Sequence, residues 1–208
     1  MTPEHVVAFW REHEASWFGG GAEFIGSALA RGPIVSRNRS ASRTASASPR
    51  TIPLQFDALC RARFHDAHFA ASRREHEAWL TTADGALALQ ILLDQIPRNV
   101  FRGTAHAFAT DSLARHYAER TVEAGLDVQV DRALRVFVYL PFEHSEELED
   151  QERAVALIRA LDHDLYLRYA EAHRDVIARF GRFPHRNAVL GRVSTEEERA
   201  WLDAGGGF

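Results

Sequence analysis

The residues that could do chemistry gather in four short polar segments between apolar stretches of the chain. The first segment covers residues 94–104, where Pro97 interrupts an apolar run and so breaks the hydrogen-bond ladder of a helix. Asp94 and Arg98 are four residues apart, so they can pair if the helical path continues through the break. Arginines here are rigid forks that match a carboxylate or a phosphate. The candidate ligand-binding residues of this segment are Asp94, Gln95, Arg98, Asn99 and Arg102.

The second segment, residues 140–152, is rich in acidic side chains. A metal site on a helix needs ligands three or four residues apart on one inward face, and most of these acids lie on the outer face instead. We interpret the segment as the solvated start of a helix capped by Ser145, and we expect no metal site. His144 and Gln151 are the two side chains that we expect to face inward, and His144 is a further candidate ligand-binding residue.

The third and fourth segments, residues 172–175 and 181–192, combine histidines with arginines. His173 shares a helix face with two tyrosines, so it is either a buried, hydrogen-bonded core histidine or a general base. The fourth segment opens on a glycine stop and holds a proline, a histidine and three arginines in twelve residues, more than a connector between helices needs. The candidate ligand-binding residues of these segments are His173, Arg174, Arg182, His185, Arg186 and Asn187.

If these segments converge in the fold, they form a cationic, amide-rich pocket that suits a small anionic ligand or a peptide carboxylate. This is our leading hypothesis. The second is a hydrolase or transferase that uses His173 or His185 as a general base. No nucleophile is evident, because no GxSxG motif occurs and Cys60 lies on an apolar helix face. The third is a protein-interaction module of the helical-repeat type. No cofactor is expected, and the sequence does not indicate an oligomeric state.

The composition excludes several other classes of chemistry. The chain has 208 residues, 46% of them hydrophobic, as expected for one globular domain. All 25 basic residues are arginines, so a Schiff-base lysine, a P-loop lysine and a Ser–Lys dyad are ruled out. The single cysteine excludes a disulfide framework, a CxxC redox motif and a cysteine-based zinc site. Because no apolar run is long enough for a signal or membrane segment, we expect a cytoplasmic protein with no membrane partner.

Residues 26–53 differ from the rest of the chain in composition. They contain six serines, five arginines and no acidic residue, so they carry a charge of +5. The remaining 20 arginines and 29 acidic residues give the rest of the chain a charge of −9. Because this stretch has neither helical nor strand periodicity, we predict a disordered or peripheral insertion within a single helical domain covering residues 1–208. Nucleic-acid binding through this basic arm ranks last among our hypotheses.

The elements that must position the polar segments are predicted to be helices, because apolar residues recur at three- and four-residue spacing and no run alternates as a strand would. Pro141 is expected to end one helix and Gly181 another, while Ser194 and Glu197 fit a capping box. The predicted helices cover residues 2–16, 55–70, 84–96, 111–124, 132–140, a stretch after Ser145, 163–180 and 194–203. We therefore predict an all-α fold of about eight helices in stacked hairpins, with no significant sheet.

Several of these stretches are also similar to a known family. The sequences LLDQIPRN (92–99), FRGT (101–104), AFATD (107–111), LPFEHSE (140–146) and GRFPHRN (181–187) resemble the bacterial domain-of-unknown-function family 924. The resemblance covers roughly residues 75–205, together with Phe9-Trp10 and Trp17-Phe18. It implies an all-α fold like that of tetratricopeptide-repeat proteins and a family without an established activity. Compared with the family pattern, most of residues 25–54 looks inserted.

Overall fold

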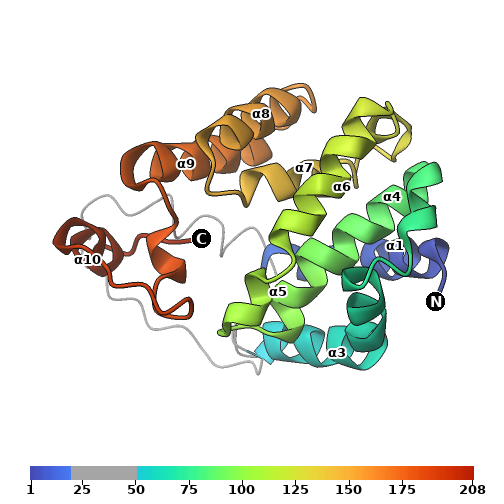
Figure 1. The fold of residues 1–208 in the computed structure, drawn as a ribbon, viewed down its shortest axis with the longest axis horizontal. Coiled ribbons are helices and arrows are strands. Elements are labelled where there is room, and N and C mark those ends of the chain that lie inside the picture. Colours follow the sequence, from blue (N-terminus) through green and yellow to red (C-terminus); the bar gives the residue numbers. More distant parts are fainter. Residues whose placement is uncertain (20–50) are drawn as a thin grey trace, which may run out of the picture.

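The computed structural model describes residues 1–19 and 51–208, and every regular element in these two ranges is a helix (Figure 1). The predicted all-α fold is therefore confirmed. The α-helices are α1 (Pro3–Glu12), α3 (Thr51–Ser72), α4 (Ala83–Gln90), α5 (Ile96–Val100), α6 (Asp111–Glu123), α7 (Val136–Glu143), α8 (Leu148–Arg159), α9 (Asp164–Phe180) and α10 (Glu196–Asp203). None of the described helices is long and apolar enough to cross a membrane. Most of the predicted insertion lies outside the described residues, and residues 51–53 belong to α3.

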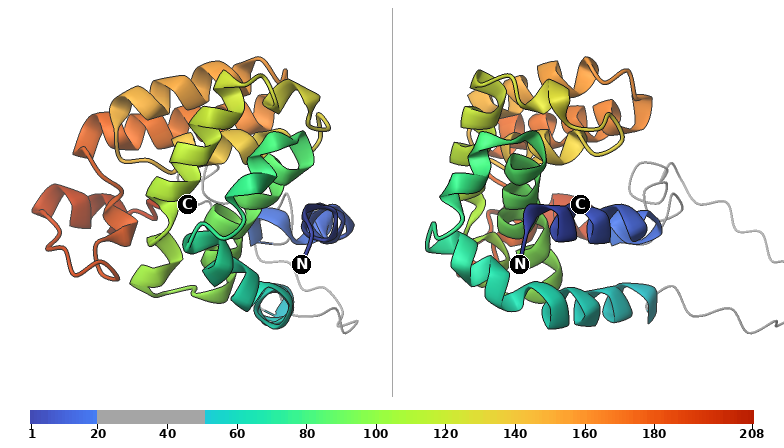
Figure 2. Two further views of the ribbon diagram at one scale, coloured as in Figure 1. Left: turned by 45° about the vertical axis from the view of Figure 1, so that its right-hand side comes forward. Right: turned by 90° about the vertical axis from the view of Figure 1, so that its right-hand side faces the viewer.

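The core is organised around α4 and α5, which a π-helical turn at Ile91–Gln95 joins into one rod. In the ribbon views, α1 packs against α4, α3 packs against α5, and α6 and α7 also contact α4 (Figures 1 and 2). The side chains of Leu89, Leu92 and Leu93 are completely buried at this centre, where they join one large apolar cluster with Phe137 of α7. The predicted enclosed central helix is thus present, and it continues past its predicted end at Ile96.

The second half of the chain forms a pair of helices followed by a smaller C-terminal part. The helices α8 and α9 pack side by side, and both contact α7 (Figure 1). The helix α9 ends at Gly181, as predicted, and the φ of +67° at this residue is the left-handed conformation that glycine adopts readily. The chain then forms a short 3-10 turn, η6 (Pro184–Arg186), and α10, which lies at the far edge of the molecule from α1 (Figure 2).

Pro97 accounts for the irregular turn between α4 and α5. It lacks an amide proton, and its ring crowds the carbonyl group four residues earlier, so carbonyl groups near the break need other partners. Side chains supply them: His68 Nδ1 lies 2.9 Å from Leu92 O, Thr110 Oγ1 donates to Leu93 O (2.5 Å), Arg98 Nη1 to Asp94 O (2.6 Å) and Asn99 Nδ2 to Gln95 O (2.9 Å). Single π turns of this kind often occur at functional sites.

Replacing Thr110 with valine should therefore destabilise the fold, because it leaves the buried Leu93 carbonyl without a partner. We expect the free energy of unfolding to fall by about 1–3 kcal/mol, measured by urea denaturation. The matched control is Thr104→Val, since the exposed Thr104 hydroxyl donates to Phe101 O (2.8 Å) where water can replace it. That variant should change stability by less than about 0.5 kcal/mol. Equal losses in the two variants would contradict the role given to Thr110.

Several predicted helix boundaries are displaced by a few residues, and two of these errors affect the second polar segment. The helix α7 continues through Pro141 to Glu143, because the amide of His144 donates to Leu140 O (2.8 Å) and closes the turn without the missing proline amide. The next helix begins at Leu148, with Glu147 rather than Ser145 at its N-cap position. As a result, Glu143 and His144 lie at the buried end of α7 rather than in a solvated helix start.

The capping box of α10 is displaced by one residue from its predicted position. Thr195 Oγ1 accepts from the amide of Glu198 (3.2 Å), and the Glu198 carboxylate accepts from the amide of Thr195 (2.7 Å). Ser194 and Glu197, the predicted pair, are not its members. Glu198 is therefore buried, at 2% exposed, and its carboxylate accepts hydrogen bonds from Arg182 and Asn187 of the fourth polar segment.

Candidate functional site

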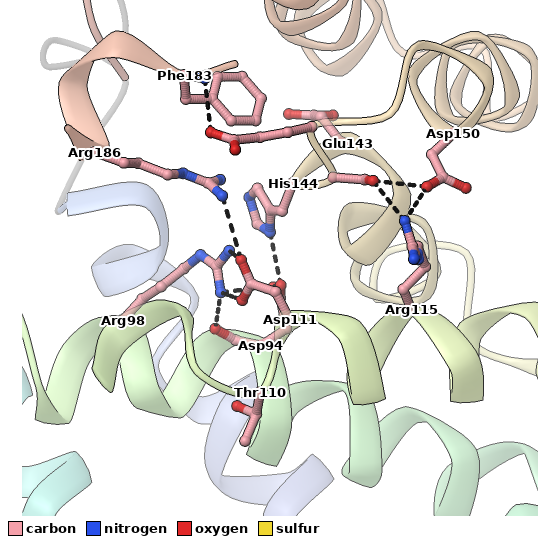
Figure 3. Close-up of polar contacts among 12 residues, drawn as sticks. Asp94, Arg98, Thr110, Asp111, Arg115, Glu143, His144, Asp150, Phe183 and Arg186 are labelled. Atoms are coloured by element: carbon pink, nitrogen blue, oxygen red, sulfur yellow. Dashed lines mark hydrogen bonds and ion pairs between the residues drawn. The ribbon is translucent and has the colours of Figure 1, made fainter. Parts of the chain in front are cut away.

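The candidate site is built around a completely buried carboxylate, Asp94, on the π-helical turn. Asp94 Oδ1 lies 2.7 Å from His144 Nδ1 at the end of α7 and 3.1 Å from Arg98 Nη1 (Figure 3). Its other oxygen, Oδ2, accepts a hydrogen bond from Gln95 Nε2. The pairing of Asp94 with Arg98 predicted from their spacing is therefore confirmed, and three polar side chains surround this carboxylate.

The charges of this group follow from its surroundings. Burial by itself would raise the pKa of Asp94, but the guanidinium of Arg98 and the contact with His144 outweigh it and bring the pKa to about 2. Burial lowers the pKa of His144 below its ordinary value, and the nearby charge of Arg98 lowers it further. At neutral pH, Asp94 is therefore ionised and His144 is neutral.

Arg98 connects this carboxylate to a second one, Asp111, at the start of α6. Its Nη1 and Nη2 atoms donate to the two carboxylate oxygens of Asp111, both at 2.9 Å, in the bidentate geometry that suits a guanidinium (Figure 3). Asp111 Oδ2 also lies 3.4 Å from Nη1 of Arg186. The sequence placed Asp111 only at the start of a predicted helix, so its role in the site was missed.

Arg186, on η6, is a buried cation with incomplete compensation. It is 6% exposed, and its guanidinium lies between the rings of Phe108 and Phe183, 4.6 and 4.3 Å from their centroids. Within the described residues its one ion pair is the long contact to Asp111, and its buried Nε atom has no hydrogen-bond partner. Burial, assisted by the charge of Arg98, lowers the pKa of Arg186 to about 10. The guanidinium is still charged at neutral pH, and within the described residues it has N–H groups that form no hydrogen bond.

A pocket of about 330 Å³ is lined by three members of this group, Asp111, His144 and Arg186. Its walls come from the turn before α6, the first turn of α6, the end of α7 and η6. Of the residues nominated from the sequence, it is lined by His144 and Arg186. The full lining in the described part of the chain is Ala105, Phe108, Ala109, Asp111, Ser112, Arg115, Pro141, His144, Ser145, Glu146, Glu147, Arg186 and Leu190.

Two other charged side chains in the pocket wall, Glu146 and Arg115, are already paired. Glu146 accepts two hydrogen bonds from Arg192 (2.6 and 2.9 Å) and one from the amide of Phe183 (2.8 Å). Arg115 donates to Asp150 (2.5 Å) and to the hydroxyl of Ser145 (2.9 Å), which itself donates to Asp150 (2.6 Å). These contacts fix the walls. Sequence reasoning did not nominate Phe108, Arg115 or Glu146, because their partners lie far away along the chain.

The two histidines proposed from sequence as a general base, His173 and His185, are not among the residues that line the pocket. His173 is buried and hydrogen-bonded, the first of its two interpretations: Nδ1 lies 2.8 Å from Tyr169 O and 3.1 Å from Glu143 Oε1. Its ring stacks on Phe208, with 3.6 Å between centroids. His185 also contacts the Phe208 ring, and burial together with the charge of Arg186 lowers its pKa to about 4.

The remaining candidates are engaged elsewhere. Arg102 pairs with Asp57 of α3, Arg174 with its neighbour Asp175, and Arg182 with Glu198. Asn187 donates to Ser194 and Glu198, and Asn99 holds the Gln95 carbonyl. The convergence expected from the sequence is therefore partial. It brings together Asp94, Gln95, Arg98, His144 and Arg186. Within residues 1–19 and 51–208, no three His, Cys, Asp or Glu side chains form a group that could hold a metal ion.

The chain is similar in sequence and fold to proteins that are themselves of unknown function. Residues 6–206 match the family described as bacterial protein of unknown function (DUF924). A solved structure of a protein of unknown function, ATU0120 from Agrobacterium tumefaciens, is 43% identical in sequence with a TM-score of 0.79. The match covers 98% of this chain and 97% of that one. No curated protein matches the sequence.

Proposed function

We propose that this chain, which belongs to the DUF924 family of bacterial proteins of unknown function, binds a small anionic molecule in the pocket lined by Arg186 and His144. The observation that supports this most strongly is the state of Arg186. A guanidinium that is 6% exposed, with one long ion pair among the described residues, is costly to bury unless a further anion approaches it.

The geometry around Arg186 also favours a carboxylate or a phosphate over other groups. The rings of Phe108 and Phe183 hold the guanidinium plane, which limits the conformational freedom that binding would otherwise cost. Asp111 is shared with Arg98, and Glu146 is occupied by Arg192, so neither acid competes fully for the cation. A carboxylate or phosphate group could therefore accept hydrogen bonds from Arg186 while another part of the ligand reaches His144.

The protein-interaction alternative has less support. The large apolar side chains exposed in the described residues are Met1, Leu54, Val128, Leu148, Leu190, Val193 and Phe208. They belong to α3, α8, the 3-10 turn Asp127–Gln129, the segment between η6 and α10, and both chain ends. Exposed apolar side chains distributed in this way are ordinary on a protein surface and do not mark a docking face.

The decisive variant for anion binding is Arg186→Met. Methionine can still fill the space between the two rings, and removal of a buried charge that is poorly paired should leave the melting temperature unchanged or higher. We expect affinity for acetate, succinate, 4-hydroxybenzoate or inorganic phosphate, titrated by ligand-observed NMR at low salt, to fall by about 10- to 100-fold, because a charge-assisted hydrogen bond is lost.

The control is Arg168→Met, since Arg168 is exposed on α9 and does not line the pocket. It removes the same charge from the protein and should leave binding as in the wild type. The proposal fails if none of these four anions binds to the wild-type protein. It also fails if the Arg186 and Arg168 variants bind equally well.

A further inference from the structure

His144 is held in a defined orientation at the pocket by Asp94. Its Nδ1 atom lies 2.7 Å from Asp94 Oδ1, and the carboxylate is fully buried. A carboxylate accepts from the ring N–H beside it, so this contact fixes the proton on Nδ1 and leaves the lone pair on Nε2. The His144 side chain is 14% exposed, and within the described residues its Nε2 atom forms no hydrogen bond. Figure 3 shows this second ring nitrogen on the side of Arg186.

The groups that surround His144 keep its imidazole neutral, with a lone pair on Nε2 that can accept a proton. Asp94 stays ionised because Arg98 and Gln95 hold it, so it can stabilise the ring after the ring takes up a proton. Charged and titratable groups act on His144 from several elements: Asp94 on the π turn, Arg98 on α5, Asp111 on α6, His173 on α9 and His185 on η6. The carboxylate in direct contact is Asp94. A histidine base whose ring is oriented by a buried carboxylate is the arrangement found in catalytic triads.

Water is the nucleophile that this arrangement offers. Two serines, Ser112 and Ser145, line the pocket, and neither is hydrogen-bonded to His144 in the part of the chain that the structure describes. The hydroxyl of Ser145 donates to Asp150 and accepts from Arg115, so it is directed away from the imidazole. A base beside a pocket without an activated side-chain nucleophile can act on a water molecule in that pocket.

We propose that Asp94 and His144 form a general-base pair that hydrolyses a carboxylic ester of a small anionic substrate, with the substrate's charged group held by Arg186. This inference rests on the proposed function, because the same pocket must first bind the anion. His144 Nε2 takes a proton from water while the water oxygen bonds to the ester carbonyl carbon. The imidazolium then returns the proton to the alcohol oxygen as the carbon–oxygen bond breaks. The products are a carboxylic acid and an alcohol, and Asp94 remains ionised throughout.

The test uses the full-length protein and 4-acetoxybenzoate, an ester whose carboxylate is too far away to attack its own ester group. We expect His144→Gln to lower kcat by about 10²- to 10⁴-fold with little change in KM. The exposed His116 provides the control, and His116→Gln should hydrolyse the ester as the wild type does. Arg186→Met should chiefly raise KM. A His144→Gln enzyme with the wild-type kcat, or a wild-type protein that does not accelerate hydrolysis, would overturn the inference.

The two proposals can fail separately. If 4-acetoxybenzoate or its product 4-hydroxybenzoate binds, and Arg186→Met weakens that binding, the anion site stands even when no ester is cleaved. In that case the general-base inference alone is overturned. If neither compound nor the other anions bind, the proposed function itself is rejected.

The positioning role of Asp94 has a readout that needs no substrate. The ¹⁵N chemical shifts of the His144 ring report which nitrogen carries the proton, and we expect Nδ1–H with a bare Nε2 in the wild type. Asp94→Asn should shift His144 toward the other tautomer and lower kcat, provided that circular dichroism shows the variant to be folded. A wild-type His144 with its proton on Nε2 would refute the assigned pair.

Discussion

Replacing Asp94 with alanine is expected to lower the free energy of unfolding by about 3–5 kcal/mol, the range for removing one partner of a buried ion pair. The carboxylate is completely buried and contacts Arg98, His144 and Gln95. Without it, Arg98 and Arg186 are left to share the single carboxylate of Asp111. Urea denaturation at neutral pH measures the loss.

The comparison that makes this result interpretable is Asp131→Ala. Asp131 pairs with Arg11 at 2.6 Å, but its side chain is 46% exposed and that of Arg11 is 51% exposed. Water replaces such a contact readily, so this variant should lose less than about 1 kcal/mol. Similar losses in the two variants would mean that the buried pair contributes no more than a surface one.

Acid titration gives the same prediction an independent check. The pKa of Asp94 in the fold, about 2, is lower than its ordinary value of 3.8. The stability from this carboxylate is therefore fully present above about pH 4 and is lost as the pH falls toward 2. The alanine variant lacks this contribution at every pH, so its stability should approach that of the wild type in strong acid. A constant difference across this range would contradict the assignment.

Local sequence patterns predicted most of the fold because they depend on near neighbours. The stop of α9 at Gly181 and the disturbed hydrogen-bond ladder before Pro97 both follow from the backbone of one residue, and both were predicted, although the helical rod continues past its predicted end at Ile96 to Val100. Pro141 was misjudged because its missing amide does not end a helix when the turn around it is fully buried. There the packing of α7, which depends on the whole fold, outweighs a local rule.

The candidate site could be predicted only where partners are close in sequence. Asp94 and Arg98 are four residues apart, so their pairing could be inferred. Arg102 and Arg182 were nominated for a pocket, yet each faces a carboxylate that no local pattern links to it, Asp57 and Glu198 respectively. The absence of an acidic residue near an arginine in the sequence therefore does not show whether that arginine is unpaired in the fold.

The buried carboxyl group of Glu143 should make the free energy of unfolding fall as the pH rises. It is 3% exposed, and burial, with the nearby charge of Asp94, raises its pKa to about 8 from an ordinary 4.5. Its neighbour His173 has a pKa well below the ordinary value, first because of burial and then because of His144. The 3.1 Å contact between Glu143 and His173 thus joins two groups that are neutral at pH 7.

Glu143→Gln should remove this dependence on pH. Below about pH 4.5 the glutamic acid is protonated in both the folded and unfolded states, so the two proteins should be equally stable. Between pH 4.5 and about 8 the unfolded chain loses a proton that the folded protein keeps, and the wild type becomes progressively less stable. Glutamine has nearly the same shape and no charge to bury.

At pH 8.5 the glutamine variant should therefore be more stable than the wild type by about 3–5 kcal/mol, since each unit of pKa shift corresponds to 1.36 kcal/mol. Urea midpoints measured from pH 4.5 to 9 would trace the divergence. The exposed Glu123 supplies the control, and Glu123→Gln should follow the wild-type curve within about 0.5 kcal/mol. Parallel curves for Glu143→Gln and the wild type would show that Glu143 is ionised in the fold, and His173 would then have to carry the matching charge.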